Sequence, residues 1–589
     1  MRSTGMASSV FGLSSLRVSL EQCSGLIWGS ECEFWNFSLL SALLWITPAT
    51  KNNGIRQTKG NECMKTIQTN SRPLWSWNAM WINRSSAILW LWFCGVTLLP
   101  LSVCAAAAAA PGPGEVRDIG SRLELFVDDY LIESMNGVGL KLHAPKRENV
   151  AIRFDDLWDG ATSHIVSVFQ DGEIYRMYYR GGPVHANGVL DNSRTCYAES
   201  KDGIHWFKPK LGLYRDEHTE STNNNIVLMR STQWHHACDN LAVFKDGRPD
   251  CLPEARYKAV GRTIKGELGR EESAEGFGAA QAGNLAFQSA DGLHWRPMRK
   301  GPVVVGDGFD SFNIAFWDAH AGCYREYHRE FHNGYRDMMT STSKDFLHWT
   351  KPQWVDYKGA QQEHIYQGQI LPYYRAPHIL FAFAERFVPD RKVQRSHPAE
   401  GISEGIFMSS RDGIRFDRRF MQGWIRPGLD PRDWMHSGTS PAWGLLQTGP
   451  TELSVYWIQN YYSVLAGKTY NSGTCYLQRG SLRLDGFVSV HAGYAGGEFV
   501  TKPIRFVGQE LIVNLSTSII GSLRVEIRDE ADEPLPGFTL ADCPEMFGDA
   551  IERVVKWQGS RDVSALAGQT VRLRMRLKDA DLYSIRFRP

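Results

Sequence analysis

The sequence predicts an all-β protein, with a five-bladed β-propeller over residues 121–481 followed by a β-sandwich over residues 482–589. Three observations carry this prediction. A seven-residue motif of the form Ser-x-Asp-Gly-x-x-aromatic recurs through the middle of the chain. Each copy follows runs rich in aromatic and β-branched residues, which is the pattern of β-strands. Beyond the repeat, apolar and basic residues alternate, which indicates strands with one buried face.

The recurring motif is typical of a tight turn after a strand. Aspartate accepts backbone N–H bonds there and glycine takes a positive φ with little strain. The interval between copies equals or exceeds the roughly 40 to 50 residues of a four-stranded propeller blade. The four copies are Ser200–Trp206, Ser289–Trp295, Ser343–Trp349 and Ser410–Phe416.

A second repeated feature is an extended run that ends in arginine and precedes each turn. Together with a further run upstream, it makes each unit a strand, a turn, a strand ending in arginine, a loop, a strand, the motif turn and an aromatic strand. That order is the meander of one propeller blade. Four units are clear, and a fifth extends from His436 to Leu477. The four arginines are Arg180, Arg262, Arg329 and Arg386.

Two further segments complete the predicted architecture. The short strand Leu123–Val127 is expected to close the ring, since the last blade of a propeller commonly borrows a strand from the other terminus. At the other end of the chain, Val571–Lys578 alternates apolar and basic residues over its whole length, and Tyr583–Phe587 continues that pattern. This alternation predicts an antiparallel sandwich whose basic row faces solvent.

The front of the chain has the layout of a secretory signal. An apolar run, Ala87–Leu101, follows Arg84 and precedes Ala105–Ala110. We therefore expect a signal peptide at residues 80–110 and a secreted or periplasmic protein, with an uncleaved membrane anchor as the alternative. Residues 1–79 are expected to be a non-native extension from an early start, because Met64 and Met80 are both possible initiators.

Composition narrows the class of function. A formal net charge of +1 argues against nucleic acid as a partner, because phosphate binding usually leaves a strongly basic surface. The six cysteines after residue 110 contain no CxxC pair, and no histidine spacing resembles a zinc site, so neither a metal nor a cofactor is expected.

Acidic residues and histidines gather just before the first strand of each unit. In a propeller these positions meet where the innermost strands converge on the axis. Carboxylates that face one another there suit cleavage of a glycosidic bond, in which one acid protonates the leaving oxygen and another acts as base or nucleophile. Each acid alone is more often a turn or strand cap. The candidates are Asp159, His164, His236, Asp239, Asp310, Glu363 and His436.

The strand-ending arginines have two interpretations. Arginine at the end of a strand commonly bonds to carbonyl groups or to an acid of a neighbouring blade, which is a structural role. If two of them reached the axis, they could instead clamp a carboxylated sugar or a phosphate.

On these features the chain resembles the five-bladed propeller superfamily that contains glycoside hydrolase families 32, 43, 62, 68 and 130, with a β-sandwich appended as in family 32. The motif turns, the phrase Phe169–Tyr179 and the run Asp239–Phe244 carry the resemblance. It implies an aspartate on blade one, an aspartate on blade two and a glutamate on a later blade. Asp239 matches the second. No carboxylate stands at residues 162–164, Asp159 being three residues earlier, and Asp310 stands where several members have glutamate.

We therefore predict an exported carbohydrate-active protein that acts on an oligo- or polysaccharide as a glycoside hydrolase. Asp239 and Asp310 are the leading catalytic candidates, and Asp159 and Glu363 complete the set. The alternatives are a non-catalytic glycan-binding propeller and a glycoside phosphorylase. The residues expected to bind substrate are His164, Arg180, His236, Arg329 and His436.

Overall fold

The computed structural model describes residues 115–589 except for 184–192, 218, 231–235, 266–280, 396–398 and 463–473. Within those residues the secondary structure consists of β-strands and four short 3-10 turns. No helix among them is long and apolar enough to cross a membrane. The predicted signal peptide and the predicted N-terminal extension lie outside the described residues.

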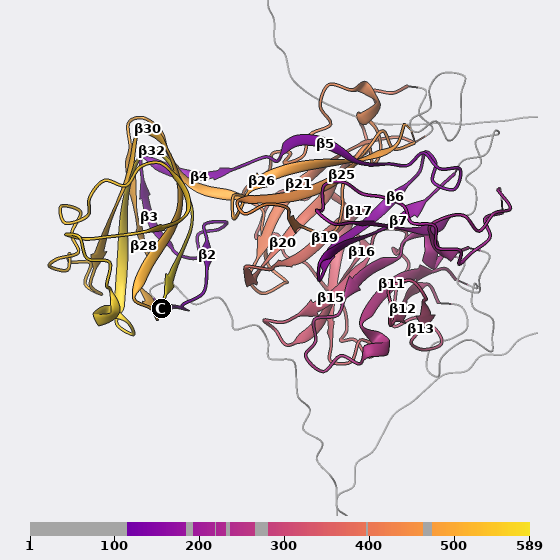
Figure 1. Ribbon diagram of the computed structural model, residues 1–589, viewed down its shortest axis with the longest axis horizontal. Helices are drawn as coiled ribbons and strands as arrows, with labels where there is room; N and C mark the ends of the chain where they lie inside the picture. Colours follow the sequence, from indigo (N-terminus) through magenta and orange to yellow (C-terminus); the bar gives the residue numbers. More distant parts are fainter. Residues whose placement is uncertain are drawn as a thin grey trace, which may run out of the picture. The chain divides into compact units, whose positions relative to one another are not determined.

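Five small antiparallel sheets form the blades of a propeller, which confirms the predicted all-β fold class and blade number (Figure 1). Blade one contains β6 (His164–Asp171), β7 (Ile174–Gly181), β8 (Arg194–Ser200) and β9 (Ile226–Met229). Blade two contains β10 (Ala242–Lys245), β11 (Tyr257–Thr263), β12 (Gly283–Ser289), β13 (Arg296–Pro297) and β14 (Val304–Val305). Blade three contains β15 (Ile314–Asp318), β16 (Cys323–His332), β17 (Tyr335–Ser343) and β18 (Gln353–Trp354). Blade four contains β19 (His364–Tyr373), β20 (Ala376–Val388), β21 (Ile402–Ser410) and β22 (Phe416–Asp417).

Blade five closes the ring with a strand from the front of the described chain, but not with the predicted one. It contains β23 (Thr439–Pro441), β24 (Leu446–Gln447), β25 (Glu452–Gln459), β26 (Tyr476–Arg483) and, on its outer edge, β5 (Lys146–Arg153). The predicted closing segment, Leu123–Val127, contributes β2 (Glu124–Leu125), which pairs with the C-terminal strand β32 (Thr570–Arg588). A short apolar strand fits either sheet edge, so its own sequence cannot specify which edge it joins.

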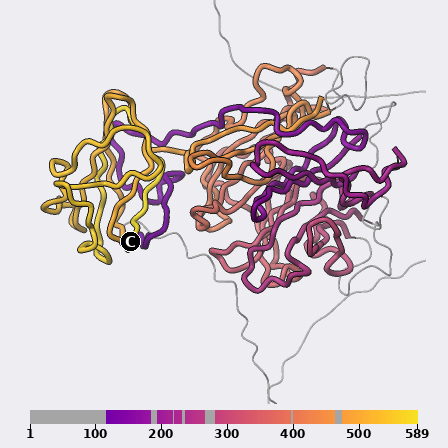
Figure 2. The backbone as a smooth tube through the Cα atoms, in the orientation of Figure 1, coloured from indigo at the N-terminus to yellow at the C-terminus, as the bar shows by residue number. Residues whose placement is uncertain are grey.

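The C-terminal strands fold around a core of their own, as the predicted sandwich requires, and they incorporate the first four described strands. Figure 2 traces these indigo segments among the yellow C-terminal ones. The propeller therefore begins at β5 rather than at residue 121. The remaining strands are β1 (Arg117–Gly120), β3 (Ile132–Asn136), β4 (Val138–Leu142), β27 (Val488–Ala492), β28 (Gly497–Thr501), β29 (Ile504–Phe506), β30 (Glu510–Arg528) and β31 (Asp549–Val554).

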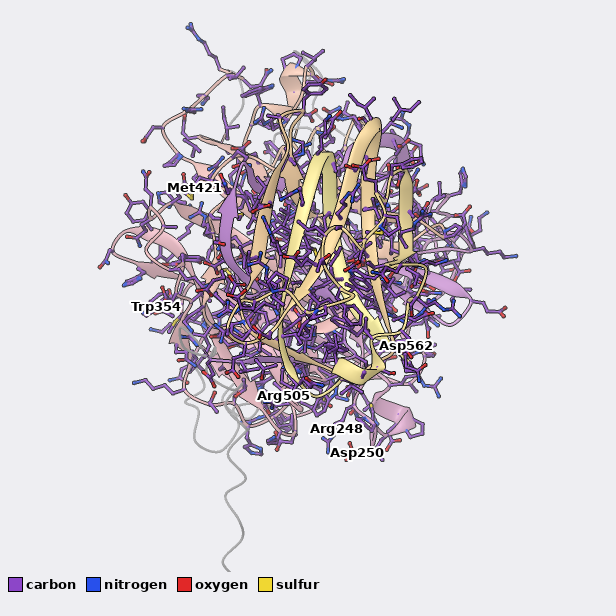
Figure 3. The ribbon with its side chains drawn as sticks, turned by 90° about the vertical axis from the view of Figure 1, so that its left-hand side faces the viewer. Arg248, Asp250, Trp354, Met421, Arg505 and Asp562 are labelled. Atoms are coloured by element: carbon purple, nitrogen blue, oxygen red, sulfur yellow. The ribbon has the colours of Figure 1, made fainter. Side chains whose placement is uncertain are left out.

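Strand β32 shows why the tail forms this domain. Its apolar side chains from Val571 to Leu577 are buried in the core, and the alternate basic residues face outward. On that outer face Arg574 donates to Glu498 of β28 at 2.8 Å. Other polar residues of the domain, such as Arg505 and Asp562, are exposed at its surface (Figure 3).

The motif turn has one hydrogen-bonding pattern in all four copies. In the first copy the Ser200 hydroxyl accepts the Gly203 N–H at 2.9 Å, and Asp202 Oδ1 accepts two backbone N–H groups at 2.8 Å each. The fourth residue of the motif has a positive φ, which glycine adopts readily. Phe346 occupies this position in the third copy with φ of 70°.

A buried tyrosine ties successive blades together at these turns. Tyr178 of β7 donates to the Gly292 carbonyl of the next blade at 2.9 Å, and Tyr327 of β16 donates to the Gly413 carbonyl at 2.7 Å. Tyr456 of β25 donates in the same way to the turn of blade one, across the junction that closes the ring. Buried tyrosine hydroxyls require such partners, so these bonds help to fix the spacing of the blades.

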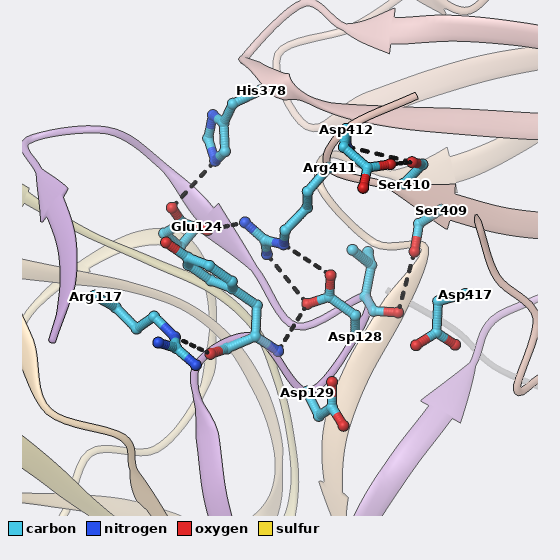
Figure 4. Close-up of polar contacts among 12 residues, drawn as sticks. Arg117, Glu124, Asp128, Asp129, His378, Ser409, Ser410, Arg411, Asp412 and Asp417 are labelled. Atoms are coloured by element: carbon cyan, nitrogen blue, oxygen red, sulfur yellow. Dashed lines mark hydrogen bonds and ion pairs between the residues drawn. The ribbon is translucent and has the colours of Figure 1, made fainter. Parts of the chain in front are cut away.

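The fourth turn also fastens the N-terminal segment to blade four (Figure 4). Arg411 donates to Asp128 at 2.7 Å and to Glu124 at 2.9 Å, and its guanidinium lies 3.9 Å from the Tyr130 ring centroid. Burial acts to raise the pKa of Glu124, but the charges of Arg411 and His378 hold it well below its usual value. The second residue of this motif turn is therefore the ion-pair partner of two buried carboxylates.

Candidate functional site

The candidate site lies at the end of the ring where the innermost strands begin, which we call the arginine end. The second strand of each of the first four blades runs back to this end and carries the predicted arginine near its terminus; in blade one, His164 pairs with Arg180. His164 Nε2 lies 3.4 Å from Gln367 Nε2 of β19, so the starts of β6 and β19 meet across the ring. The meander order alone therefore brings these residues to one end.

Asp239 and Asp310 are joined by one arginine. Arg262 of β11 donates from Nη2 to Asp239 at 3.0 Å and from Nη1 to Asp310 at 2.5 Å. The two carboxylates differ in environment, since the Asp239 side chain is 8% exposed and the Asp310 side chain 72% exposed. The site thus holds one buried and one solvated carboxylate on a shared guanidinium.

One oxygen of Asp239 remains unbonded. Asp239 lies in a 3-10 turn, Ala237–Asp239, that immediately precedes β10. Its Oδ1 is buried and makes no hydrogen bond to any of the described residues. Buried polar atoms are nearly always hydrogen-bonded in native proteins, so such an atom beside the axis is a candidate for contact with a ligand.

A row of aromatic rings connects blades one, five and four. His164 lies 5.1 Å from Tyr461 between ring centroids, His436 lies 6.3 Å from Tyr461, and His436 lies 4.9 Å from Tyr366 of β19. Burial lowers the pKa of His164 well below its usual value, and the charges of Arg180 and His436 lower it further. His164 is therefore a neutral ring near pH 7.

Arg180 links this row to the carboxylates. It donates to the Thr162 carbonyl at 3.0 Å and to the Tyr461 hydroxyl at 3.0 Å. Burial acts to lower its pKa, but Tyr461 and the charges of the two aspartates raise it. The charges of Asp239 and Asp310 therefore act on the Arg180 guanidinium.

Arg329 lies on the blade-four side of the same row. Its Nε donates to the Gly308 carbonyl at 3.1 Å, and its Cζ is 5.1 Å from the Tyr366 ring centroid. Arg336 of β17, which the sequence patterns did not single out, lies 5.2 Å from the same centroid. The arginine end thus includes six of the predicted site residues: His164, Arg180, Asp239, Asp310, Arg329 and His436.

His236 adjoins the site through the backbone. Its carbonyl accepts the Asp239 N–H at 3.2 Å, and its ring lies 3.1 Å from an Arg230 nitrogen. It therefore supports the turn that presents Asp239.

Asp159 and Glu363 have partners outside this cluster. Asp159 is fully buried and accepts from Lys208 at 2.5 Å and from Tyr179 at 2.9 Å. Burial raises its pKa to about 6, against the opposing charge of Lys208. Glu363 is bonded to Arg418 and, at 3.2 Å, to Arg386. Both carboxylates are thus engaged in ion pairs of their own.

Asp159 also belongs to the one acidic group in the described part of the chain whose spacing would suit a metal ion, with Asp155 and Asp156. The Lys208 ammonium lies 3.3, 2.9 and 2.5 Å from these three carboxylates. Lys208 thus forms an ion pair with each of the three carboxylates, and its ammonium occupies the place between them.

Glu385 is the acidic residue that sequence reasoning missed. It lies on β20, is fully buried, and accepts hydrogen bonds from Ser437 at 2.9 Å, from Ser440 at 2.7 Å and from Gln367. Burial raises its pKa. A charged residue in the otherwise apolar run before Arg386 was the available signal. Gln367 connects it to His164, so it lies just beneath the site.

The other end of the ring differs in character. A cavity of about 500 Å³ lies where the innermost strands end, and its lining includes Phe169, Phe244, Trp317 and Trp443. Large apolar rings dominate there, with Lys245 and Asp246 at the side. The polar groups that could carry chemistry are therefore at the arginine end and not around this cavity.

No family model and no curated protein matches the chain. Among solved structures, a β-1,2-mannobiose phosphorylase from Listeria innocua is 11% identical over 59% of this chain and 97% of its own, with a TM-score of 0.37. A family 43 arabinoxylan arabinofuranohydrolase from Bacillus subtilis is 10% identical over 76% and 99%, with a TM-score of 0.35. An exo-inulinase from Aspergillus awamori is 10% identical over 75% and 98%, with a TM-score of 0.34. Similarities of this size do not identify a reaction.

Proposed function

We propose that the protein is a carbohydrate-active enzyme that hydrolyses glycosidic bonds with Asp239 and Asp310. The observation that carries the proposal is the arrangement of these two carboxylates on one guanidinium, one buried and one solvated. Glycoside hydrolysis uses two carboxylates in different roles, and different environments are how proteins separate such roles.

The different environments of Asp239 and Asp310 suit different catalytic roles. Asp239 presents a buried, unbonded Oδ1, which in the protonated carboxyl suits proton donation to the glycosidic oxygen and in the ionised carboxylate accepts from a sugar hydroxyl. Asp310 is open to solvent, which suits activation of the attacking water. Arg262 orients both side chains through one hydrogen bond to each.

The aromatic row fits the same substrate class. Tyr366, His436 and Tyr461 are half-buried rings at the arginine end, where Arg180 donates to Tyr461 and Arg329 stacks on Tyr366. Ligand sites are commonly lined by aromatic side chains with a few polar groups that fix orientation. A sugar ring, with apolar C–H groups on its faces and hydroxyls on its edge, matches such a lining.

The test is a screen of purified protein against polysaccharides and aryl glycosides, with Asp239→Asn and Asp310→Asn beside wild type. Asp250→Asn is the matched control, because Asp250 is an exposed acid that pairs only with neighbouring Arg248. We expect both site variants to lose turnover, although their unfolding free energies should stay within about 1 kcal/mol of wild type. The control variant should retain turnover. Full turnover by both site variants would refute the proposal.

A second candidate is a non-catalytic glycan-binding propeller. The engagement of Asp159 by Lys208 favours it, since no blade-one carboxylate then joins the cluster. Under this alternative, glycans bind without turnover, and Asp239→Asn leaves that binding intact. A phosphorylase would be recognised in the same screen by turnover that requires added inorganic phosphate.

We also propose that the protein is exported, because Ala87–Leu101 and Ala105–Ala110 have the layout of a cleaved signal. Expression from Met64 and from Met80 should give one mature N-terminus within or just after the alanine run. N-terminal sequencing of the mature protein decides this, and a mature chain that retains residues 1–79 would contradict it.

A further inference from the structure

Two arginines of blade three share the ring of one tyrosine. The Cζ atoms of Arg329 and Arg336 lie 5.1 and 5.2 Å from the ring centroid of Tyr366. Arg336 also lies 4.9 Å from the centroid of Phe387 and 5.8 Å from that of Phe331. Aromatic faces therefore hold both guanidinium groups, as cation–π contacts do.

The hydrogen-bond donors of this pair are largely unused. A guanidinium offers five N–H donors. The guanidinium of Arg329 makes a single hydrogen bond, to the Gly308 carbonyl, and that of Arg336 makes none with any residue in the described ranges. The Nε of Arg336 is buried without a partner. The Nε of Arg262 is in the same state, so the feature that sets the pair apart is its unused Nη donors.

The other strand-ending arginines differ from this pair. Arg262 bonds to two aspartates, Arg386 bonds to Glu363 and Glu404, and Arg180 bonds to a carbonyl and a tyrosine hydroxyl. Those three fulfil the structural role that arginine usually has at a strand end. Arg329 also donates to one carbonyl, but its Nη donors are unused, and Arg336, at the start of β17, makes no such bond to the described residues.

No carboxylate among the described residues bonds to the pair, although the charges of Glu385 and Asp310 act on Arg336. Asp310 is bonded to Arg262, and the carboxylate of Glu385 is taken up by Ser437, Ser440 and Gln367. Burial lowers the pKa of Arg336, and the like charge of Arg329 lowers it further. The fold thus keeps two cations together in a partly desolvated place, which is unfavourable unless an anion joins them.

From this geometry we infer that Arg329 and Arg336 bind an oxyanionic group carried by the sugar substrate. The inference rests on the proposed function, because it places the group on a glycan bound at the arginine end. The planar fork of a guanidinium matches the two oxygens of a carboxylate or sulfate, and aromatic stacking fixes that fork in advance. The substrate class is then a uronate-bearing or sulfated saccharide, in contact with Tyr366 and within reach of Asp310.

The first experiment compares charged saccharides with their neutral counterparts. The full chain with Asp239→Asn, which blocks turnover, is applied to a glycan array that contains uronate-bearing, sulfated and neutral saccharides. The best charged probe is then titrated calorimetrically beside its carboxyl-reduced or desulfated form, and beside inorganic phosphate alone. We expect the charged form to bind at least tenfold more tightly than its neutral form.

The second experiment locates the interaction. In the same background, Arg336→Gln should weaken binding of the charged probe about tenfold or more and leave the neutral form unaffected, since hydrogen bonds to charged groups are the stronger kind. Arg336→Lys, which keeps the charge and loses the fork, should restore part of the affinity. Arg505→Gln is the matched control, because it removes one exposed arginine from the C-terminal domain (Figure 3) and should change nothing.

The possible outcomes separate the two proposals. Equal affinity for charged and neutral forms would overturn the oxyanion inference and leave the proposed function standing. Binding of inorganic phosphate at Arg336, with charged and neutral sugars equivalent, would show that the anion comes from solution and would also overturn it. If no saccharide binds, both proposals fail.

Discussion

Replacing Arg262 with methionine tests the central arrangement of the site. Methionine keeps much of the apolar stem and removes the guanidinium that joins Asp239 to Asp310. The two ion pairs should contribute very unequally to stability. Asp310 is 72% exposed, and exposed pairs contribute about 0 to 1 kcal/mol. Asp239 is 8% exposed, and stranding a buried charge costs about 3 to 5 kcal/mol.

We therefore expect Arg262→Met to lower the free energy of unfolding by about 3 to 4 kcal/mol at pH 7, nearly all of it through Asp239. Asp239→Asn should cost about 1 kcal/mol or less, because the amide oxygen still accepts from Arg262 and Arg262 retains Asp310. The double variant should then be more stable than Arg262→Met alone. The expected coupling between the two positions is about 2 kcal/mol, within the range for residues in one network.

The assay is urea unfolding of the four proteins followed by tryptophan fluorescence. Unchanged m-values would show that the differences reflect native-state stability. A loss below 1 kcal/mol for Arg262→Met, or a double variant no more stable than the single one, would refute the reasoning. Either result would mean that Arg262 does not stabilise the buried Asp239 side chain in the folded protein.

Three further predictions concern residues away from the catalytic pair. Arg411→Met should cost about 3 to 5 kcal/mol because it strands the buried Asp128 and removes one cation from Glu124, which keeps Arg122 and His378. Arg415→Met in the same turn should cost under about 1 kcal/mol; chemical denaturation compares the two variants, and equal losses would contradict the burial argument. Tyr327→Phe removes the bond between blades three and four and should cost about 1 to 3 kcal/mol by the same assay, so a neutral result would mean that this bond is dispensable. Burial raises the pKa of Asp433 to about 7, so the folded state holds that proton more tightly than the unfolded state does. Its contribution to stability is present below about pH 4 and is lost as the pH rises to 7, so Asp433→Asn should gain about 4 kcal/mol relative to wild type between pH 4 and pH 8. Parallel pH profiles for the two proteins would contradict this.

Sequence reasoning predicted most of the residues that gather at the arginine end, because propeller geometry follows from strand order. In a four-stranded meander the first strand begins where the second one ends, so residues before the first strand and arginines at the end of the second must meet. His164 and Arg180 illustrate this, since they pair directly across β6 and β7. Asp239 and Arg262 meet in the same way in blade two.

Asp159 shows where this positional argument stops. It lies near enough in sequence to the start of β6 to share the site, yet Lys208 and Tyr179 take both of its oxygens. Glu385 and Arg336 show the reverse, because neither stands at the repeated position and both lie beside the site. The hydrogen-bond and ion-pair partners of such charged residues lie far away in the sequence. Only the folded structure therefore shows which of these residues are fully bonded.

The sequence by itself determined the strands, the turns and the number of blades, because these depend on interactions between near neighbours along the chain. The motif turn is the clearest case, because the side chains of Ser200 and Asp202 accept backbone N–H groups from residues at most three positions away. Tertiary structure alone decided that β5 closes the ring, that β2 joins the C-terminal domain, and that Arg329 and Arg336 keep unused donors. A short strand fits more than one sheet edge and an arginine can bond to many acceptors, so only the packed fold selects among them.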